Sequence, residues 1–296
     1  MRGQLVPAGG SGGGFGVRAG VPVRDALDSA VIAIGASGSE SARLDAELLL
    51  AHALGVSRTE LFLEPARMVA GPAVRSFQDL VRRRAVGHEP VAYLLGRKGF
   101  RYIELAVDSR VLVPRPETEL LVEAALGLPA GARVLDVGTG SGAVALALKH
   151  ERRDLVVVGA DVSEDALDVA RANRDALALE VELTRADLLD GIGTDWDAVL
   201  SNPPYVAETD RARLPPDVAR HEPPGALFAG EDGLDVIRRL IPQIAATRAA
   251  MMAIEHGAGQ APQVRALAEQ AGFAEVRSVT DLAGIDRIVV ARRAPQ

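Results

Sequence analysis

The stretch VLDVGTGSG at residues 134–142 decides how the rest of the chain is interpreted. A short apolar run, typical of a buried strand, enters a turn with three glycines, and a helical pattern follows. Glycines let the backbone approach a ligand closely, and the first turn of a helix offers unpaired N–H groups. Asp161 lies 19 residues after Gly142, at the end of the next expected strand, where a carboxylate can accept hydrogen bonds from two ribose hydroxyls. The stretch therefore predicts a ligand-binding turn between a strand and a helix.

The spacing of the glycines narrows the kind of ligand. A dinucleotide site usually reads G-x-G-x-x-G and a P-loop ends in Gly-Lys-Ser/Thr, whereas this loop reads G-x-G-x-G. The short form, with Asp136 at the end of its strand, resembles the first motif of S-adenosylmethionine-dependent methyltransferases. The resemblance implies that the loop faces the methionine part of the cofactor, through Gly138, Thr139, Gly140, Ser141 and Gly142. After the third expected strand, Asp187 can accept from the adenine amino group and Leu188 can cover the ring.

A second motif, Asn202-Pro203-Pro204-Tyr205, follows the fourth expected strand, residues 198–201. The carboxyl ends of neighbouring parallel strands lie together, so we expect this motif to meet the glycine loop. An amide or aromatic-amine nitrogen is a poor nucleophile because its lone pair is delocalised, but two acceptors can bind its N–H groups and aim it. The Asn202 side-chain oxygen and the Pro203 carbonyl can serve as these acceptors, and the prolines stiffen the turn. Tyr205 can lie against the flat face of the planar substrate group. The motif therefore predicts methylation of a nitrogen on a planar group, a reaction that requires no metal.

The chain divides into four stretches. Residues 1–20 contain eight glycines and are predicted to form a flexible tail. Residues 21–95 have apolar side chains at helical spacing and predict four or five short helices, and residues 96–113 predict a linking hairpin. In residues 114–296 strands alternate with helices, which predicts an α/β domain with a mostly parallel sheet covered on both faces. The expected strands are 133–137, 155–160, 181–184, 198–201, 250–255, 276–280 and 287–291, and the expected helices are 143–149, 165–173, 236–246 and 260–271.

Two local patterns in the helical stretch carry expectations of their own. Residues 57–60 read Ser-Arg-Thr-Glu, the form of a capping box, and predict the start of a short helix. Residues 82–84 are three consecutive arginines near the end of a helix expected from about Ala73, and we interpret them as a solvated helix face.

Composition excludes several classes of protein. The chain has 296 residues, a net charge of −7 and no cysteine, so disulfide, thiolate-metal and cysteine-nucleophile chemistry are absent. An acidic balance and only 3% aromatic residues disfavour stable nucleic-acid binding. Neither a long apolar run nor a secretory signal is visible, so we expect no membrane span and a cytoplasmic protein.

Taken together, these motifs and further stretches of the sequence resemble the release-factor glutamine methyltransferase family (HemK/PrmC). The matching stretches are 89–96 with Phe100, 113–119, 136–142, 202–205, 221–223 with 226–227, and 255–257. The resemblance implies a Rossmann-like sheet of seven strands and a helical N-terminal domain that docks a protein substrate. It further implies methyl transfer from S-adenosylmethionine to the side-chain N5 of the glutamine in the Gly-Gly-Gln loop of class I peptide-chain release factors, with S-adenosylhomocysteine as the product.

The resemblance also implies roles for single residues. By this resemblance, the cofactor contacts the glycine loop, Asp161, Leu188 and Asn202, and the substrate glutamine contacts residues 202–205. Some relatives have an aromatic residue where this chain has Leu188. Arg115, Glu117 and Glu119 could line the mouth of the site or cap a helix, and a structural role is expected for His221, Glu222 and His256 because their spacing is not that of a metal site.

Three alternatives stay open from the residues alone. An adenine-N6 DNA or RNA methyltransferase uses a similar tetrapeptide, but it needs a basic cleft and base flipping. These motifs hardly distinguish a glutamine methyltransferase that acts on a release factor from one that acts on a ribosomal protein. A catalytically silent binding module is disfavoured by the intact Asn202 and Asp161.

Overall fold

The computed structural model describes residues 20–294, which form two compact units divided between Gly87 and His88. The glycine-rich tail predicted at residues 1–20 lies outside the described residues, except for Gly20. The boundary between the units falls before the one expected at residue 95, because α5 (Val91–Leu95) packs on the strand that follows it.

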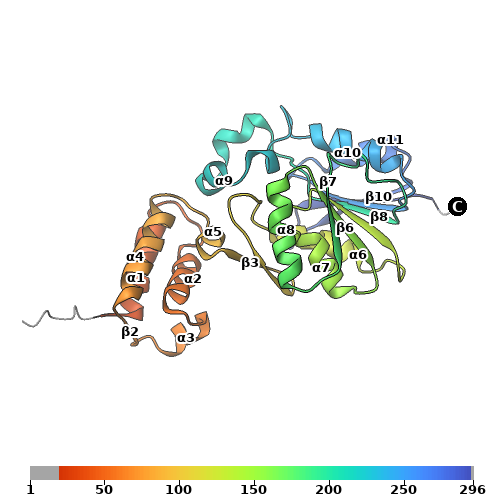
Figure 1. Cartoon of the computed structure of the whole chain (residues 1–296). Helices are drawn as coiled ribbons and strands as arrows, with labels where there is room; N and C mark the ends of the chain where they lie inside the picture. Colours follow the sequence, from red (N-terminus) through yellow and green to blue (C-terminus); the bar gives the residue numbers. More distant parts are fainter. Residues whose placement is uncertain (1–19, 295–296) are drawn as a thin grey trace, which may run out of the picture. The chain divides into compact units, whose positions relative to one another are not determined.

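The first unit is a bundle of short helices (Figure 1). Its elements are β1 (Val21–Pro22), α1 (Val23–Gly35), α2 (Ala42–Leu54), α3 (Arg58–Leu63), β2 (Met68–Val69) and α4 (Pro72–Ala85), with β1 antiparallel to β2. Helix α1 buries Val23, Leu27, Ala30 and Ile34, the stripe expected of an amphipathic helix. The predicted capping box is confirmed, since Ser57 and Glu60 bond each other's backbone N–H groups at the start of α3.

The interpretation of residues 82–84 as a solvated face is wrong for Arg84. Its side chain is only 10% exposed, and its Nε donates to Asp45 Oδ2 at 2.8 Å. Hydroxyl groups of Ser39 and Ser41 also donate to this carboxylate, each at 2.9 Å. Because successive helical residues are rotated by about 100°, three arginines in a row point in different directions, and here Arg84 is the one that faces the neighbouring helix α2.

The second unit begins with α5, and a hairpin follows it directly. Strands β3 (Arg97–Phe100) and β4 (Ile103–Ala106) form the predicted antiparallel pair. The Asn173 side chain holds the hairpin: its Oδ1 accepts from Ala106 N at 2.7 Å and its Nδ2 donates to Ala106 O at 3.0 Å. The same Nδ2 donates to Ser141 O at 2.9 Å. One buried amide therefore connects the hairpin to the glycine loop.

A seven-stranded sheet forms the centre of this unit, and its strand order is β10-β11-β9-β8-β5-β6-β7. The strands are β5 (Arg133–Val137), β6 (Val156–Asp161), β7 (Val181–Arg185), β8 (Ala198–Ser201), β9 (Met251–Glu255), β10 (Glu275–Thr280) and β11 (Asp286–Arg292). The five from β7 to β9 are parallel, and β11 is antiparallel to both of its neighbours. The predicted α/β class and seven-stranded sheet are confirmed.

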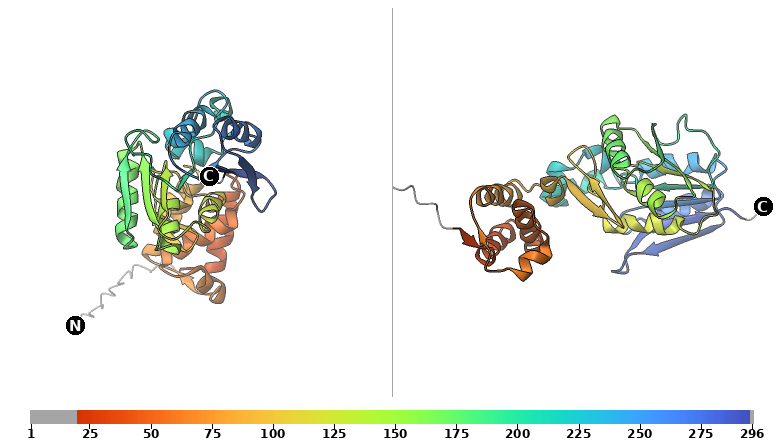
Figure 2. Two further views of the ribbon diagram at one scale, coloured as in Figure 1. Left: turned by 90° about the vertical axis from the view of Figure 1, so that its right-hand side faces the viewer. Right: turned by 60° about the horizontal axis from the view of Figure 1, so that its bottom comes forward.

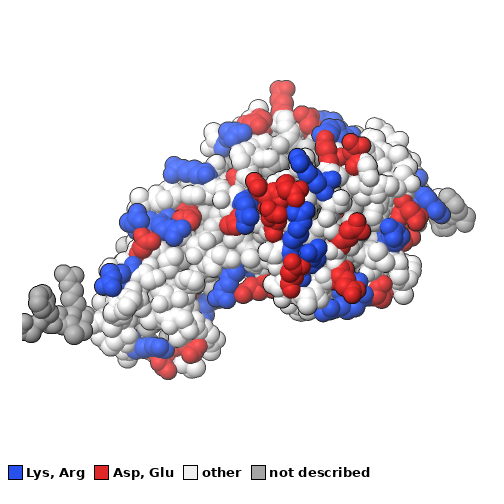
Figure 3. Space-filling view, in the orientation of Figure 1, with Lys and Arg blue, Asp and Glu red and all other residues white. Residues whose placement is uncertain are grey.

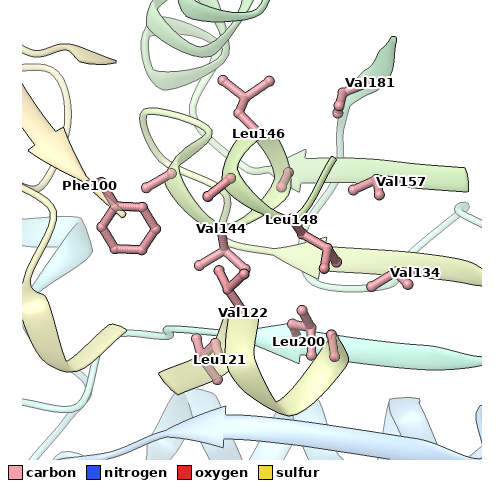
Figure 4. Close-up of a cluster of buried hydrophobic side chains, with 14 of the residues drawn as sticks. Phe100, Leu121, Val122, Val134, Val144, Leu146, Leu148, Val157, Val181 and Leu200 are labelled. Atoms are coloured by element: carbon pink, nitrogen blue, oxygen red, sulfur yellow. The ribbon is translucent and has the colours of Figure 1, made fainter. Parts of the chain in front are cut away.

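Helices cover both faces of the sheet (Figures 1 and 2). On one face lie α6 (Glu119–Ala125), α7 (Ala143–Glu151) and α8 (Glu164–Ala176), and on the other lie α10 (Asp235–Ala245) and α11 (Ala261–Gln270). Figure 4 shows the first layer, where Phe100 of the hairpin, Val122 of α6 and Val144 of α7 meet Val134 and Leu200 of the sheet. Strands β8 and β9 are buried along their whole length, which explains their uninterrupted apolar sequence.

Short elements that the sequence pattern did not indicate lie between β8 and α10. They are η2 (Glu208–Arg213), α9 (Pro216–His221) and η3 (Pro224–Ala226), whereas η1 (Pro116–Thr118) leads into α6 at the helix start that Pro114 and Pro116 favour. Such pieces are too short to show a hydrophobic period. Among residues 20–294, no helix is long and apolar enough to cross a membrane.

We predict that Arg84→Met lowers the free energy of unfolding of the helical unit by about 3–5 kcal/mol, because the buried Asp45 loses its cation. Denaturant unfolding of the full chain, followed by circular dichroism, measures the change. Arg82→Met on the same helix is the matched control, since Arg82 and Asp79 form an exposed pair, and it should change stability by less than about 1 kcal/mol. Equal effects of the two substitutions would contradict this account.

Candidate functional site

The site lies at the carboxyl ends of β5 and β8. These strands are parallel neighbours with Val137 opposite Ser201, and the Ser201 hydroxyl donates to Val137 O at 2.7 Å. The pairing brings the glycine loop and the tetrapeptide together, as expected: a Cβ built on Gly138 would lie 3.8 Å from the Asn202 carbonyl oxygen. A cavity of about 540 Å³ opens here, within the range of small-molecule sites.

Asp136 stabilises the glycine loop through hydrogen bonds. This buried carboxylate accepts from Thr139 Oγ1 at 2.6 Å and from Ala145 N at 3.2 Å, and burial raises its pKa to about 6. Glycine is required in the loop itself, because φ is +83° at Gly142 and an added Cβ would lie 2.8 Å from Leu146 Cδ1. The loop is thus a rigid turn that leads into α7.

Asp161 at the end of β6 lies beside this turn. Its Oδ2 accepts from Gly140 N and its Oδ1 from Ser163 N, both at 2.9 Å. Burial raises the pKa of Asp161, and these backbone donors oppose the shift. Each carboxylate oxygen has two acceptor positions, so both oxygens can still accept a hydroxyl group from a ligand. Asp161 therefore braces the loop and also lines the cavity.

Asp187 and Leu188 line the cavity after β7. The Asp187 carboxylate pairs with Arg239 of α10 at 2.6 Å, and both side chains are about half exposed. Leu188 has a positive φ of 58°, an unusual conformation for a leucine, and it packs against the apolar core on the α10 side of the sheet.

Three residues of the tetrapeptide line the cavity, namely Asn202, Pro203 and Pro204. Asn202 Nδ2 donates to Thr118 Oγ1 at 3.1 Å, so its Oδ1 remains available as an acceptor. Tyr205 is not among the cavity-lining residues: its hydroxyl donates to Glu255 Oε1 at 3.1 Å. Gly142 also lies outside the lining, as the residue that caps α7.

Glu255, at the end of β9, is the most perturbed acid near the site. It is 1% exposed, and burial raises its pKa to about 7. The hydrogen bond from Tyr205 and the positive charge of Arg287 oppose the shift, and the negative charge of Glu117 adds to it. Glu255 is part of the 255–257 stretch in the sequence, but nothing in its local pattern predicts its hydrogen bond with Tyr205.

Sequence reasoning missed several other residues that line the cavity. They come from the segment after the hairpin, from the turn after α9 and from α10: Arg110, Leu112, Pro114, Thr118, Pro223, Gly225, Ala226, Val236 and Arg239. Some of these residues lie in the stretches 113–119 and 221–227, which resemble the family. That resemblance was the available signal, but neither stretch was assigned to the cofactor cavity.

Glu222 and His256, for which a structural role was expected, are both buried. The Glu222 side chain is 1% exposed, and its Oε1 accepts a hydrogen bond from Arg115 Nη2. Burial raises the pKa of Glu222. His256 is buried, and its Nδ1 lies 2.9 Å from the Gly257 carbonyl oxygen. Within residues 20–294, no group of three or more potential ligands could hold a metal ion.

Comparisons with known proteins agree with this geometry. A family model of the PrmC N-terminal domain matches residues 25–96, and a model of the methyltransferase small domain matches residues 116–215. The catalytic domain of hMettl16, in complex with the MAT2A 3′UTR hairpin 1, has a TM-score of 0.53 and 16% sequence identity, covering 77% of this chain and 83% of that chain. At this identity the likeness concerns the fold alone.

Two relatives are similar over almost their whole length. The release factor glutamine methyltransferase of Rhodopirellula baltica is 41% identical over 271 residues, which cover 87% of this chain and 91% of that protein. The protein of the same name from Xylella fastidiosa (strain 9a5c) is 42% identical over 273 residues, which cover 90% of this chain and 98% of that protein. Identity at this level across both units shows that the chain belongs to the release factor glutamine methyltransferase family.

Proposed function

We propose that this methyltransferase transfers a methyl group to the side-chain N5 of the glutamine in the Gly-Gly-Gln loop of a class I peptide-chain release factor. The observation that carries the proposal is the position of Asn202, which donates through Nδ2 to Thr118 and lines a cavity together with the glycine loop and Asp161, so that its side-chain oxygen is available to accept. Family membership gives the substrate class, since the relatives are named release factor glutamine methyltransferases.

The methyl donor is S-adenosylmethionine, and the cavity of about 540 Å³ beside the glycine loop is of the size of small-molecule sites. A Cβ built on Gly140 meets no atom within 4 Å, so at this position the loop leaves open space for a ligand. We propose that residues 138–141 hold the methionine part, that Asp161 binds the ribose, and that Asp187 and Leu188 hold the adenine. The cofactor supplies an activated methyl group, so the protein's task is orientation.

Asn202 and Pro203 perform that orientation in the proposed mechanism. The Asn202 oxygen and the Pro203 carbonyl accept the two N–H groups of the glutamine amide, which directs the nitrogen towards the cavity. Pro203 is buried, and successive prolines restrict the backbone, so these acceptors are held in place before the substrate arrives. We propose that Pro204 and Tyr205 complete the substrate contact, with the Tyr205 ring held by its bond to Glu255.

We propose that the partner is a folded protein rather than a nucleic acid. The net charge is −7, and on the face shown in Figure 3 the basic side chains of the catalytic unit are interspersed with acidic ones. Many are paired, for example Arg238 with Asp232 and Arg211 with Glu208 at 2.9 Å. Duplex binding needs a continuous basic footprint. We propose that the helical unit docks the release factor, and that the enzyme works in the cytoplasm, where translation takes place.

Mass spectrometry of a purified release factor, incubated with the full chain and S-adenosylmethionine, tests the proposed function. One methyl group should appear on the Gly-Gly-Gln glutamine, and a release factor with glutamate at that position should remain unmodified. A mixture of ribosomal proteins and a DNA duplex serve as competing substrates. Methylation of either, with the release factor unmodified, would overturn the assignment.

We predict that Asp161→Ala weakens S-adenosylmethionine binding by about 1.5–3 kcal/mol, because hydrogen bonds to a charged acceptor are lost. Titration calorimetry on the full chain measures the change. Asp154→Ala is the matched control, since Asp154 is an exposed acid paired with Arg152 and does not line the cavity. Unchanged affinity in a folded Asp161→Ala variant would remove Asp161 from the ribose site.

We predict that Asn202→Ala lowers kcat about 100-fold, because the acceptor that orients the amide acts mainly in the transition state. The KM for the release factor should change much less. Single-turnover rates and cofactor affinity, measured on the same preparation, separate the two effects. A variant that methylates at the wild-type rate would rule out the proposed role of Asn202.

A further inference from the structure

Two side chains of α10 bind the turn that follows β7. Arg239 Nη2 donates to Asp187 Oδ2 at 2.6 Å, and Gln243 Oε1 accepts from Leu189 N at 3.0 Å. Residues four apart lie on the same face of a helix, so both contacts come from one face of α10. This turn, residues 187–189, includes the two side chains that are proposed to hold the adenine ring.

The buried stripe of α10 fixes how this helix is rotated about its own axis. Its side chains that are fully buried in the core are Ile237, Leu240, Ile241 and Ile244. At about 100° per residue, Val236, Arg239 and Gln243 all fall on one flank of this stripe. Val236 and Arg239 line the cofactor cavity together with Asp187. The apolar core therefore sets where the guanidinium group of Arg239 can reach.

The backbone of the turn is held by hydrogen bonds on both sides of Leu188. Leucine rarely adopts the positive φ of 58° found at this residue, so the turn needs contacts that keep it in this conformation. Asp190 N donates to Asp187 O at 3.1 Å, and Gln243 binds the peptide N–H that follows Leu188. With the backbone held, the direction of the Asp187 side chain is what remains to be set.

Arg239 sets that direction. The Asp187 side chain is 54% exposed and that of Arg239 is 56% exposed, and among residues 20–294 only Arg239 bonds this carboxylate. An exposed ion pair contributes little to the stability of a fold. It can still orient an acceptor, because the bond at Oδ2 leaves Oδ1 available for a donor in the cavity.

We propose that Arg239 is a positioning residue for the adenine ring: its bond to Oδ2 holds the Asp187 carboxylate so that Oδ1 accepts from the 6-amino group of the cofactor. The inference rests on the proposed function, because it explains how Asp187 makes the adenine contact assigned to it there. In this role Arg239 acts through Asp187 and touches no part of the cofactor. Without Arg239, the carboxylate would rotate in water and would have to be ordered at each binding event, which weakens binding.

Titration calorimetry of the full chain with two ligands tests this role. The ligands are S-adenosylhomocysteine and its analogue in which hydrogen replaces the 6-amino group of the purine. The wild type should bind the analogue about tenfold to a hundredfold more weakly, as expected when a hydrogen bond to a charged acceptor is lost. Arg239→Met should reduce this ratio at least about threefold, whereas Arg239→Lys keeps the charge and should retain most of it. Because both ligands carry the same charges, the ratio does not respond to the loss of a positive charge as such.

Arg238→Met is the matched control from the same helix. Arg238 is also about half exposed and pairs with Asp232 and Asp235, but it does not line the cavity, so the ratio should not change. Asp187→Ala supplies a second test and should abolish the discrimination between the ligands. Adding Arg239→Met to that variant should cause no further loss of affinity for S-adenosylhomocysteine, because the group through which Arg239 acts is already missing.

The outcomes separate this inference from the proposed function. If Arg239→Met keeps the wild-type ratio, or still weakens binding when Asp187 is absent, Arg239 does not act through Asp187 and the inference is overturned. A wild type that binds both ligands equally well places the 6-amino group away from Asp187 and also overturns it, while methylation of the release factor stands. If the ratios change as expected but the release factor remains unmodified, the proposed substrate fails and the positioning role stands.

Discussion

The ladder of parallel hydrogen bonds between β5 and β8 is the constraint on which the site depends. It sets Val137 opposite Ser201, so the glycine loop and the tetrapeptide leave the sheet at the same edge although they are some 60 residues apart in the chain. A shift of one residue in this register would move the side chains of the shifted strand to the opposite face of the sheet and separate the two halves of the cavity. The apolar faces of the sheet thus protect the geometry of a polar site.

Much of the fold followed from hydrophobic pattern, and the reasons are physical. The strands at 133–137 and 198–201 were predicted at the bounds that the structure shows, because parallel strands covered on both faces need uninterrupted apolar sequence. The short elements η2 and α9 were missed because they are shorter than two helical turns. Arg84 was misread because charge alone does not reveal a buried partner, and Asp45 lies 39 residues away in sequence.

The candidate site was predictable to the extent that its residues belong to short motifs. Asp161 and Asn202 stand at strand ends next to recognisable turns, and both line the cavity. Thr118 and Glu255 could be placed only once the strand order was known, because Thr118 bonds Asn202 from η1 and Glu255 bonds Tyr205 from β9. Sequence spacing also assigned a ligand role to Asp161 without revealing that it braces Gly140, a task that belongs to the fold as much as to binding.

Asn173 has a consequence for which substitutions the chain can accept. Its two amide protons and its oxygen are committed to three backbone groups, two on Ala106 and one on Ser141, in a position that is 3% exposed. Aspartate has the acceptor but neither donor, alanine would leave all three backbone groups without a partner, and glutamine carries the same groups on a longer stem. This position therefore has almost no chemical freedom, although it makes no contact with the cavity, and a search for essential residues guided only by nearness to a ligand would pass over it.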